Sequence, residues 1–340
     1  GFLDYFTSDL AIDLGTANTL IICNGNIVID EPSIIAIDRL TNKVIAIGSE
    51  AMQMHEKTHE NIRTIRPLKD GVIADFHAAE HMIRGMIKMI DNNKKLFPVS
   101  HRMVICIPSG ITEVEKRAVR DSAEHAGAKE VYMIQEPIAA AIGIGIEIEK
   151  PFGSMIIDIG GGTTEIAIIA LSGIVTDQSI RTAGDSFTAD IIDYMKRQHN
   201  LLIGERSAET IKIEVGSAMT ELKDAPEDLD IRGRDLVTGI PKVVKISYSE
   251  IGFAMDKSIS KIEEAVLKAL ENAPPELSAD IYDNGIYLTG GGALLRGLDK
   301  RLALKTKLQI HVAEDPLKAV VRGTGMALRN IDSFKPVLMN

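Results

Sequence analysis

One motif occurs twice in this chain of 340 residues, and it constrains the fold more than any other feature. Residues 11–19 read AIDLGTANT, and residues 155–165 read MIIDIGGGTTE. Each copy is an apolar run that ends at an aspartate and is followed by a turn of glycine and small hydroxyl residues. Glycine turns between strands let backbone N–H groups converge on an anion such as phosphate. The repeat therefore predicts two similar units, each with a phosphate-binding turn.

The segments around the first turn have a clear predicted order. Residues 9–32 read as an antiparallel meander with a hairpin turn at Asn24-Gly25. A strand at 101–108, a helix at 112–128 that begins with a Thr112/Glu115 capping box, and a strand at 131–134 follow. Strand, helix and strand in this order predict a parallel pair joined by a right-handed crossover.

The second half of the chain repeats this order. A second meander is predicted over 155–180, with a turn at Gly173, and helical periodicity returns at 205–219 and 259–272. A strand at 285–288 then leads to the glycine turn TGGG at 289–292, which is predicted to open a helix over 293–303 directly. The front-half helix around 82–90 has apolar residues at helical spacing, which indicates a core face.

Composition excludes several classes of protein. The net charge of -10, the pI near 5.4 and the aromatic content of 4% without Trp argue against a protein that coats nucleic acid. Cys23 and Cys106 lie in apolar runs, so we interpret them as buried thiols. This interpretation fits a reducing compartment. The first residues lack the pattern of a signal peptide, and no run is apolar enough to span a bilayer. We expect a cytoplasmic protein.

Other nucleotide folds and metalloenzymes have little support in the sequence. There is no P-loop motif, and the glycine strings at 143 and 323 lack the third glycine of a dinucleotide fingerprint. His55 and His59 have i,i+4 spacing, but no third ligand is evident, so we interpret them as a solvated helix face.

The aspartates before the two turns are candidate partners of a hydrated cation. Mg²⁺ keeps most of its waters, so one or two carboxylates and the phosphate oxygens suffice to hold it. Asp13 and Asp158 fit this role through water. The alternative is that Asp-Gly is ordinary hairpin chemistry at each turn. The third turn suits a base or an α-phosphate at a helix start.

Taken together, these motifs resemble the actin and sugar kinase ATPase superfamily, and within it the MreB family of bacterial actins. The resemblance extends over roughly residues 9–330 and rests on DLAIDLGTANTLI, IPSGITEVEKRA, QEPIAAAIG, IDIGGGTTEIAI, HNLLIGERSAETIK and LTGGGALLRGL. It implies an α/β fold of duplicated actin-like (RNase H-like) domains, each a mixed five-stranded sheet flanked by helices, with nucleotide between them. It also implies domain I at 1–150 with the C-terminal helix 315–340 packing back on it, domain II at 151–314, and small subdomains at about 31–75 and 185–250.

The resemblance also implies roles for individual residues. The cofactors would be ATP and Mg²⁺. The residues of the phosphate turns, of the ribose and adenine contacts and of the adenosine turn would be Gly15, Thr16, Ala17, Asn18, Gly160, Gly161, Gly162, Thr163, Glu209, Lys212, Gly290, Gly291, Gly292 and Ala293. Without the resemblance, Glu209 and Lys212 read as a solvated i,i+3 ion pair.

The expected reaction is slow ATP hydrolysis. Glu136 could orient the attacking water or take its proton, and Thr163 could hold that water. The structural alternative for Glu136 is a cap on the helix that follows it.

The resemblance implies head-to-tail protofilaments that pair and lie at the inner face of the cytoplasmic membrane. It also implies partners in cell-wall synthesis that set rod shape. Two apolar elements are candidates for membrane contact: Phe2, Leu3 and Phe6, and the tip Leu96 and Phe97 beside lysines. Alternatives are a small-molecule kinase of the same superfamily, for which no acceptor motif stands out, and an Hsp70-type chaperone ATPase, which needs a longer chain after TGGG.

Overall fold

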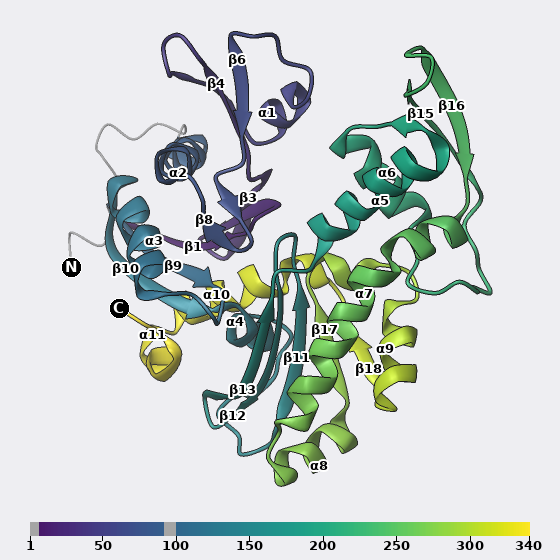
Figure 1. Cartoon of the computed structure of the whole chain (residues 1–340). Helices are drawn as coiled ribbons and strands as arrows, with labels where there is room; N and C mark the ends of the chain where they lie inside the picture. Colours follow the sequence, from purple (N-terminus) through teal and green to yellow (C-terminus); the bar gives the residue numbers. More distant parts are fainter. Residues whose placement is uncertain (1–6, 92–99) are drawn as a thin grey trace.

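The structure, a computed structural model, describes residues 7–91 and 100–340. The described elements form two large five-stranded sheets, two small three-stranded sheets, one two-stranded hairpin and the helices around them (Figure 1). In the described ranges, no helix has both the length and the apolar character that a bilayer crossing needs.

The first sheet follows the predicted order. It contains β1 (Thr7–Leu14), β2 (Asn18–Cys23), β3 (Asn26–Pro32), β9 (Ser100–Ile107) and β10 (Ala128–Gln135), in the spatial order β10-β9-β1-β2-β3. The β1-β2-β3 meander is antiparallel, whereas β1, β9 and β10 run parallel. Asn24 and Gly25 both have positive φ, which confirms the predicted hairpin turn.

The second sheet repeats the first. It contains β11 (Ser154–Ile159), β12 (Thr164–Ala170), β13 (Gly173–Ile180), β17 (Ile286–Thr289) and β18 (Ile310–Val312), in the order β13-β12-β11-β17-β18. A meander again occupies one side, and two parallel strands occupy the other. The duplicated α/β architecture that the sequence predicted is confirmed.

The turn between β12 and β13 differs from the prediction at Gly173. Leu171 and Ser172 take the left-handed conformation, with φ of 52° and 58°, while Gly173 is the first residue of β13 and pairs with Ala170. A two-residue turn of this hand matches the twist of the strands, and the sheet holds two non-glycine residues in it.

Each large sheet carries a small one. The first small sheet contains β4 (Ile35–Asp38), β5 (Val44–Ile47) and β6 (Ile62–Ile65), with α1 (Ser49–Met54) beside it, and the β7 (Leu68–Lys69) and β8 (Val72–Ile73) hairpin follows. The second contains β14 (Leu201–Leu202), β15 (Leu229–Asp235) and β16 (Pro241–Ile246). These sheets fall within 31–75 and 185–250; the division of the chain into domains and subdomains at the predicted bounds is our proposal.

Eight further helices of the described ranges lie around the sheets. They are α2 (Phe76–Asp91), α3 (Glu113–His125), α5 (Gly184–His199), α6 (Glu205–Val215), α7 (Tyr248–Glu271), α8 (Pro275–Asn284), α9 (Leu298–Thr306) and α11 (Ile331–Phe334). Three of them, α2, α6 and α7, cover segments where the spacing of apolar residues predicted a helix. Met82, Ile83, Met86 and Ile87 of α2 are buried, as expected of a core face, and the Thr112/Glu115 capping box opens α3.

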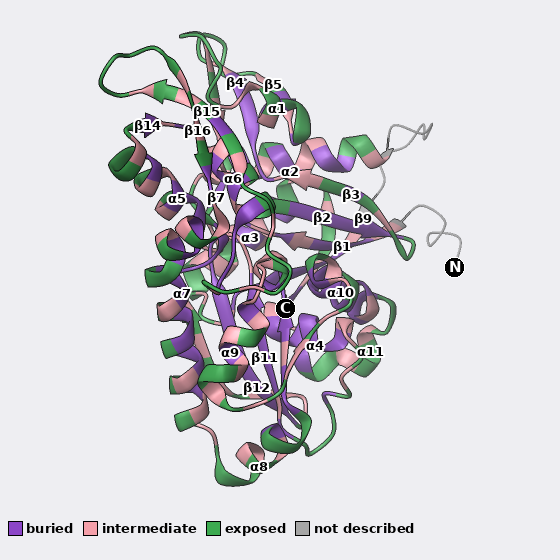
Figure 2. Cartoon of the chain, turned by 90° about the vertical axis from the view of Figure 1, so that its right-hand side faces the viewer, coloured by how far each residue is buried: buried purple, intermediate pink, exposed green. Residues whose placement is uncertain are grey.

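Two helices lie between the large sheets, and each contacts the sheet of the other half of the chain. α4 (Glu136–Gly143) follows the first sheet in the chain and packs against β11 and β12 of the second as well as β9 and β10 of the first, whereas α10 (Ala319–Arg329) packs against β1, β2 and β9 of the first. The two helices touch at backbone level, because a Cβ on Gly143 would overlap the Ala319 carbonyl oxygen and one on Gly323 would overlap that of Ala139. Figure 2 shows this central layer largely buried.

Candidate functional site

The two glycine turns meet. The first joins β1 to β2 and the second joins β11 to β12. A Cβ built on Gly161 would lie 2.8 Å from the Ala17 Cβ, and one built on Gly162 would lie 2.7 Å from the Thr16 Oγ1. Only glycine allows the turns to approach so closely. The structure therefore brings together the turns that the sequence assigned to phosphate binding.

A third segment closes onto the same place. The Gly71 N–H, in the β7–β8 hairpin, donates a hydrogen bond to Thr16 Oγ1 at 2.9 Å. A Cβ on Gly71 would approach Thr163 Cγ2 at 3.1 Å and Thr163 Oγ1 at 3.3 Å. The Thr163 side chain is buried, and its carbonyl accepts the Gly160 N–H at 3.0 Å, which tightens the second turn.

The two predicted cation partners occupy equivalent positions near the ends of β1 and β11. Burial raises the pKa of Asp13 to about 6, partly offset by a hydrogen bond from the Cys106 thiol at 3.1 Å. Burial raises the pKa of Asp158 to about 7, with further contributions from the charges of Asp13 and Glu165, against a hydrogen bond from Thr289 Oγ1 at 3.2 Å. The charge of Asp13 opposes the ionisation of Asp158, so the two carboxyl groups form a local environment that a cation would stabilise.

Glu136 lies with these aspartates. It is the first residue of α4, whose N-cap is Gln135, and no side-chain hydrogen bond caps the helix. Burial raises the pKa of Glu136 well above its usual range, and the charges of Glu165, Asp158 and Asp13 add to the shift. The carboxyl group thus belongs electrostatically to the site rather than to the helix end.

The sequence analysis missed Glu165, the fourth carboxyl group. Its side chain is 1% exposed, and it accepts hydrogen bonds from Ser109 Oγ at 2.6 Å and from Ser179 Oγ at 2.7 Å. Burial raises its pKa, and these hydrogen bonds partly offset the shift. The signal for it was present in the sequence, because Glu165 is the one charged residue in the otherwise uncharged strand TEIAIIA.

The third glycine turn lies beside Asp158 but does not open a long helix. Residues Gly291–Leu294 form a short 3₁₀ helix, Leu295 is extended, and α9 begins only at Leu298. The prediction of a helix directly after TGGG is therefore wrong. The reason is backbone conformation, since Gly290 and Gly297 have φ of 81° and 74° and interrupt the helix at both ends of the segment. Ala293 is buried in this turn.

Glu209 and Lys212 form more than a solvated ion pair. The Lys212 Nζ lies 2.7 Å from a Glu209 carboxylate oxygen, and its side chain is only 16% exposed. It also donates to the Thr188 hydroxyl and to the Gly184 carbonyl, both at 3.1 Å. The Gly184 N–H in turn donates to the Gly160 carbonyl at 3.0 Å, which connects α6 to the second phosphate turn.

His55 and His59 do not share a helix face, so that interpretation is wrong. α1 ends at Met54, and the sequence HEKTH has the spacing of a zinc motif without its helix. The His55 ring instead lies between Thr64 Oγ1 and a Glu205 carboxylate oxygen, each at 2.8 Å. Polar atoms of His55, Glu56 and Glu205 lie within 4.8 Å of one another.

The remaining candidates divide into two groups. Cys23 and Cys106 are buried and form no disulfide, as predicted. The membrane candidates Phe2, Leu3, Phe6, Leu96 and Phe97 lie outside the described residues.

Known proteins match this chain over nearly its whole length. The family described as MreB/Mbl protein matches residues 7–336. The cell shape-determining protein Mbl of Bacillus subtilis is 49% identical over 330 residues, which cover 97% of this chain and 98% of Mbl. The cell shape-determining protein MreB of Escherichia coli is 49% identical over 336 residues, which cover 97% of this chain and 96% of that protein.

Solved structures give the same picture. MreB5 of Spiroplasma citri bound to ADP has a TM-score of 0.90 and 40% identity, covering 96% of this chain and 98% of that one. The same protein bound to AMPPNP also has a TM-score of 0.90. The MamK double helical filament has a TM-score of 0.78 at 21% identity, covering 96% of this chain and 99% of that one, a likeness of fold alone.

Proposed function

This chain belongs to the MreB/Mbl family of actin-like proteins, and we propose that it binds and slowly hydrolyses ATP with Mg²⁺ between its two glycine turns. The observation that carries the proposal is the contact of the Gly161–Gly162 turn with Ala17 and Thr16. Turns with convergent backbone N–H groups, pressed together from two sheets, suit a polyphosphate held from both sides.

The residues at the site fit a hydrated magnesium ion. Asp13 and Asp158 offer carboxylate oxygens as ligands. Their pKa values are raised, which indicates that no nearby positive charge stabilises their ionised forms. A bound cation would neutralise charge on the carboxylates and on phosphate. Asp13 and Asp158 would hold it through water.

The chain's own residues have separate roles in nucleotide binding. Residues 15–18 and 160–163 contribute the phosphate turns. Glu209 and Lys212 would contact ribose and adenine from α6, and residues 290–293 would lie by the adenosine. Spiroplasma citri MreB5, which is similar over nearly the whole chain, has been solved with ADP and with AMPPNP.

For hydrolysis, Glu136 would orient the attacking water and accept its proton. Burial raises the pKa of Glu136, and a raised pKa makes the ionised carboxylate a stronger base. Thr163, buried beside Gly71, would hold the water against the second turn. In phosphoryl transfer the protein mainly positions the reactants. Slow hydrolysis is sufficient here, because the nucleotide would act as a switch for assembly.

Nucleotide state would control assembly. A contact between unlike faces of successive copies does not close and generates filaments. Head-to-tail protofilaments, paired, would lie on the inner face of the cytoplasmic membrane and organise the cell-wall synthesis that gives rod shape. The names of the Bacillus subtilis and Escherichia coli relatives, which are cell shape-determining proteins, support this role.

The test is sedimentation of the purified protein with ATP and Mg²⁺, with ADP, and without nucleotide, each with and without anionic vesicles. We expect pelleting with ATP and Mg²⁺, and enhanced pelleting with vesicles. One double variant replaces Leu96 and Phe97 by serine, and a second replaces Phe2 and Phe6 by serine. The variant that loses vesicle binding identifies the element that contacts the membrane. A protein that stays in the supernatant under all conditions, or that binds no nucleotide, contradicts the proposal.

A further inference from the structure

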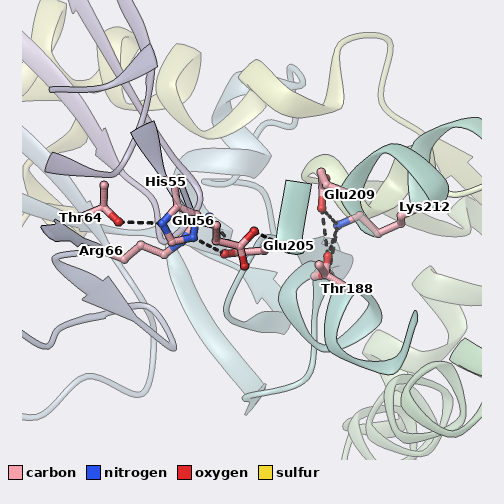
Figure 3. A network of polar contacts seen from close by, with 9 residues as sticks. His55, Glu56, Thr64, Arg66, Thr188, Glu205, Glu209 and Lys212 are labelled. Carbon is pink, nitrogen blue, oxygen red and sulfur yellow. Dashed lines mark hydrogen bonds and ion pairs between the residues drawn. The ribbon is translucent and has the colours of Figure 1, made fainter. Parts of the chain in front are cut away.

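A second polar network joins the two small sheets outside the phosphate turns (Figure 3). One side consists of His55 and Glu56, which follow α1, and Arg66, which follows β6. The other side is Glu205, the first residue of α6. We call these four residues the clasp. Glu205 is far from the other three residues in sequence, so the clasp joins segments that the fold alone brings together.

Glu56 caps α6 from the opposite side. The N-cap of α6 is Gly204, which has no side chain to accept the exposed backbone N–H groups of the first turn. The Glu56 carboxylate instead accepts the Glu205 N–H at 2.8 Å. A Cβ on Gly204 would overlap that carboxylate, and Glu56 has a φ of 60°, a left-handed conformation that is uncommon for this residue.

The Glu205 carboxylate uses both oxygens across the same contact. His55 Nε2 lies 2.8 Å from one oxygen, and the Arg66 guanidinium donates to the other at 2.7 Å. Because a carboxylate oxygen only accepts, His55 Nε2 carries the hydrogen, while its Nδ1 contacts Thr64 Oγ1 at 2.8 Å. The His55, Arg66 and Glu205 side chains are between 21% and 32% exposed, so water screens these contacts only in part.

The clasp is connected to the nucleotide side of α6. Glu209 lies one turn after Glu205, and Lys212 lies about one turn further. Lys212 donates to Thr188 and to the Gly184 carbonyl, and Gly184 donates to Gly160 of the second phosphate turn. A continuous series of contacts therefore runs from His55 through α6 to the second phosphate turn.

A metal ion is the other chemistry that His55, Glu56 and Glu205 could support. The contacts oppose it. Glu56 is occupied by the α6 amide, and Glu205 already pairs with Arg66, whose positive charge would repel a cation. Both Glu205 carboxylate oxygens and Glu56 Oε2 are therefore used in contacts within the chain, while Arg66 Nε is buried without a hydrogen-bond partner among the described residues.

We propose that Glu205 is a positioning residue for nucleotide binding: held by His55, Glu56 and Arg66, it fixes α6 so that Glu209 and Lys212 stay in place against the nucleotide. This inference rests on the proposed function. Loss of the clasp frees α6 and speeds nucleotide release while every proposed nucleotide contact remains in the chain.

The experiment measures the dissociation rate of a fluorescent ATP analogue from the full chain by displacement with excess ATP. Glu205→Ala and His55→Ala should each raise the rate, about tenfold for Glu205→Ala, which corresponds to about 1.4 kcal/mol. The double variant should release at about the rate of Glu205→Ala alone, because both changes break one contact. The matched control is Glu214→Ala, an exposed glutamate at the other end of α6, which should leave the rate unchanged.

A folding defect is separated from the proposed effect by thermal unfolding of each variant without nucleotide. A Glu205→Gln variant retains size and one acceptor, and it should show an intermediate rate. Equal release rates for wild type, Glu205→Ala and His55→Ala overturn the positioning role of Glu205 and leave the proposed function standing. A wild-type chain that binds no analogue overturns the proposed function, and the positioning role falls with it.

Discussion

Gly161 lies against Ala17, so that a Cβ at position 161 would come within 2.8 Å of the Ala17 Cβ. This contact joins the two copies of the repeated motif, and it makes Gly161 sensitive to the smallest possible enlargement. Asp13 and Asp158 lie shortly before the two turns, and the charge of Asp13 contributes to the raised pKa of Asp158.

We expect Gly161→Ala to weaken nucleotide binding at least tenfold, because the added methyl group forces the two turns apart. The measurement is equilibrium binding of a fluorescent ATP analogue. Gly173→Ala is the control, since a Cβ there meets nothing closer than the Ala170 carbonyl at 3.8 Å, and it should bind as wild type does. Unchanged affinity of Gly161→Ala would show that the nucleotide does not depend on this contact.

Asp158→Asn should have opposite effects on stability with and without ligand. Folding raises the pKa of Asp158 from 3.8 to about 7, so the unfolded chain loses its proton first and the wild-type protein loses stability as pH rises between these values. Without ligand at pH 8, the variant should be more stable by about 4 kcal/mol, because the pKa rises by about three units and each unit corresponds to about 1.4 kcal/mol.

The same Asp158 variant should lose the additional stability that ATP with Mg²⁺ gives to wild type. Thermal unfolding between pH 5 and pH 8, with and without the ligands, measures both effects. Because the neutral amide cannot titrate, the variant's stability should be less dependent on pH in this range. Full stabilisation of Asp158→Asn by Mg²⁺ and ATP would contradict the role of Asp158 in holding the ion.

Glu136→Gln should lower phosphate release about a hundredfold or more, since loss of a general base typically removes this much rate. Nucleotide affinity should change little, because the amide keeps the size of the side chain and Glu136 is assigned to the attacking water. Single-turnover phosphate release and analogue binding separate the two quantities. Wild-type hydrolysis by this variant would assign the chemistry to another residue.

Arg301→Ala should destabilise the protein and leave nucleotide binding unchanged. The guanidinium contacts both oxygens of the buried Glu263, at 2.9 and 3.1 Å, and joins α9 to α7. Removing the cation leaves a buried carboxylate unpaired, at a cost of about 3 kcal/mol. Chemical denaturation measures the effect, and Asp256→Ala, which removes Arg301's more exposed partner, should cost less than about 1 kcal/mol. Equal costs for the two variants would refute this explanation.

The duplicated architecture could be predicted from sequence because local patterns specify it. The Asp-Gly turns, the Asn24-Gly25 hairpin and the Thr112 capping box each depend on neighbouring residues, and their order along the chain fixes the pairing of strands. The same patterns placed Asp13 and Asp158 at equivalent strand ends, and the structure brings the carboxyl groups close enough for their charges to interact.

Features that depend on distant residues were missed or wrong. His55 has a partner, Glu205, at the start of α6, and spacing within the HEKTH segment cannot indicate it. Glu165 becomes a site residue only through Ser109 and Ser179, which come from other segments. The turn at Leu171 and Ser172 requires conformations that these residues rarely adopt alone, so the neighbouring Gly173 was the more natural prediction.

The packing of α4 and α10 limits how this molecule can be divided. α4, from the first half of the chain, packs against the second large sheet, and α10, from the second half, packs against the first. The two helices cross at Gly143 and Gly323, where no side chain would fit. A polypeptide severed at Gly153 would yield fragments that each lack a wall of their own interior. The two halves of the chain therefore share one interior layer, and we expect them to unfold together rather than as two independent modules.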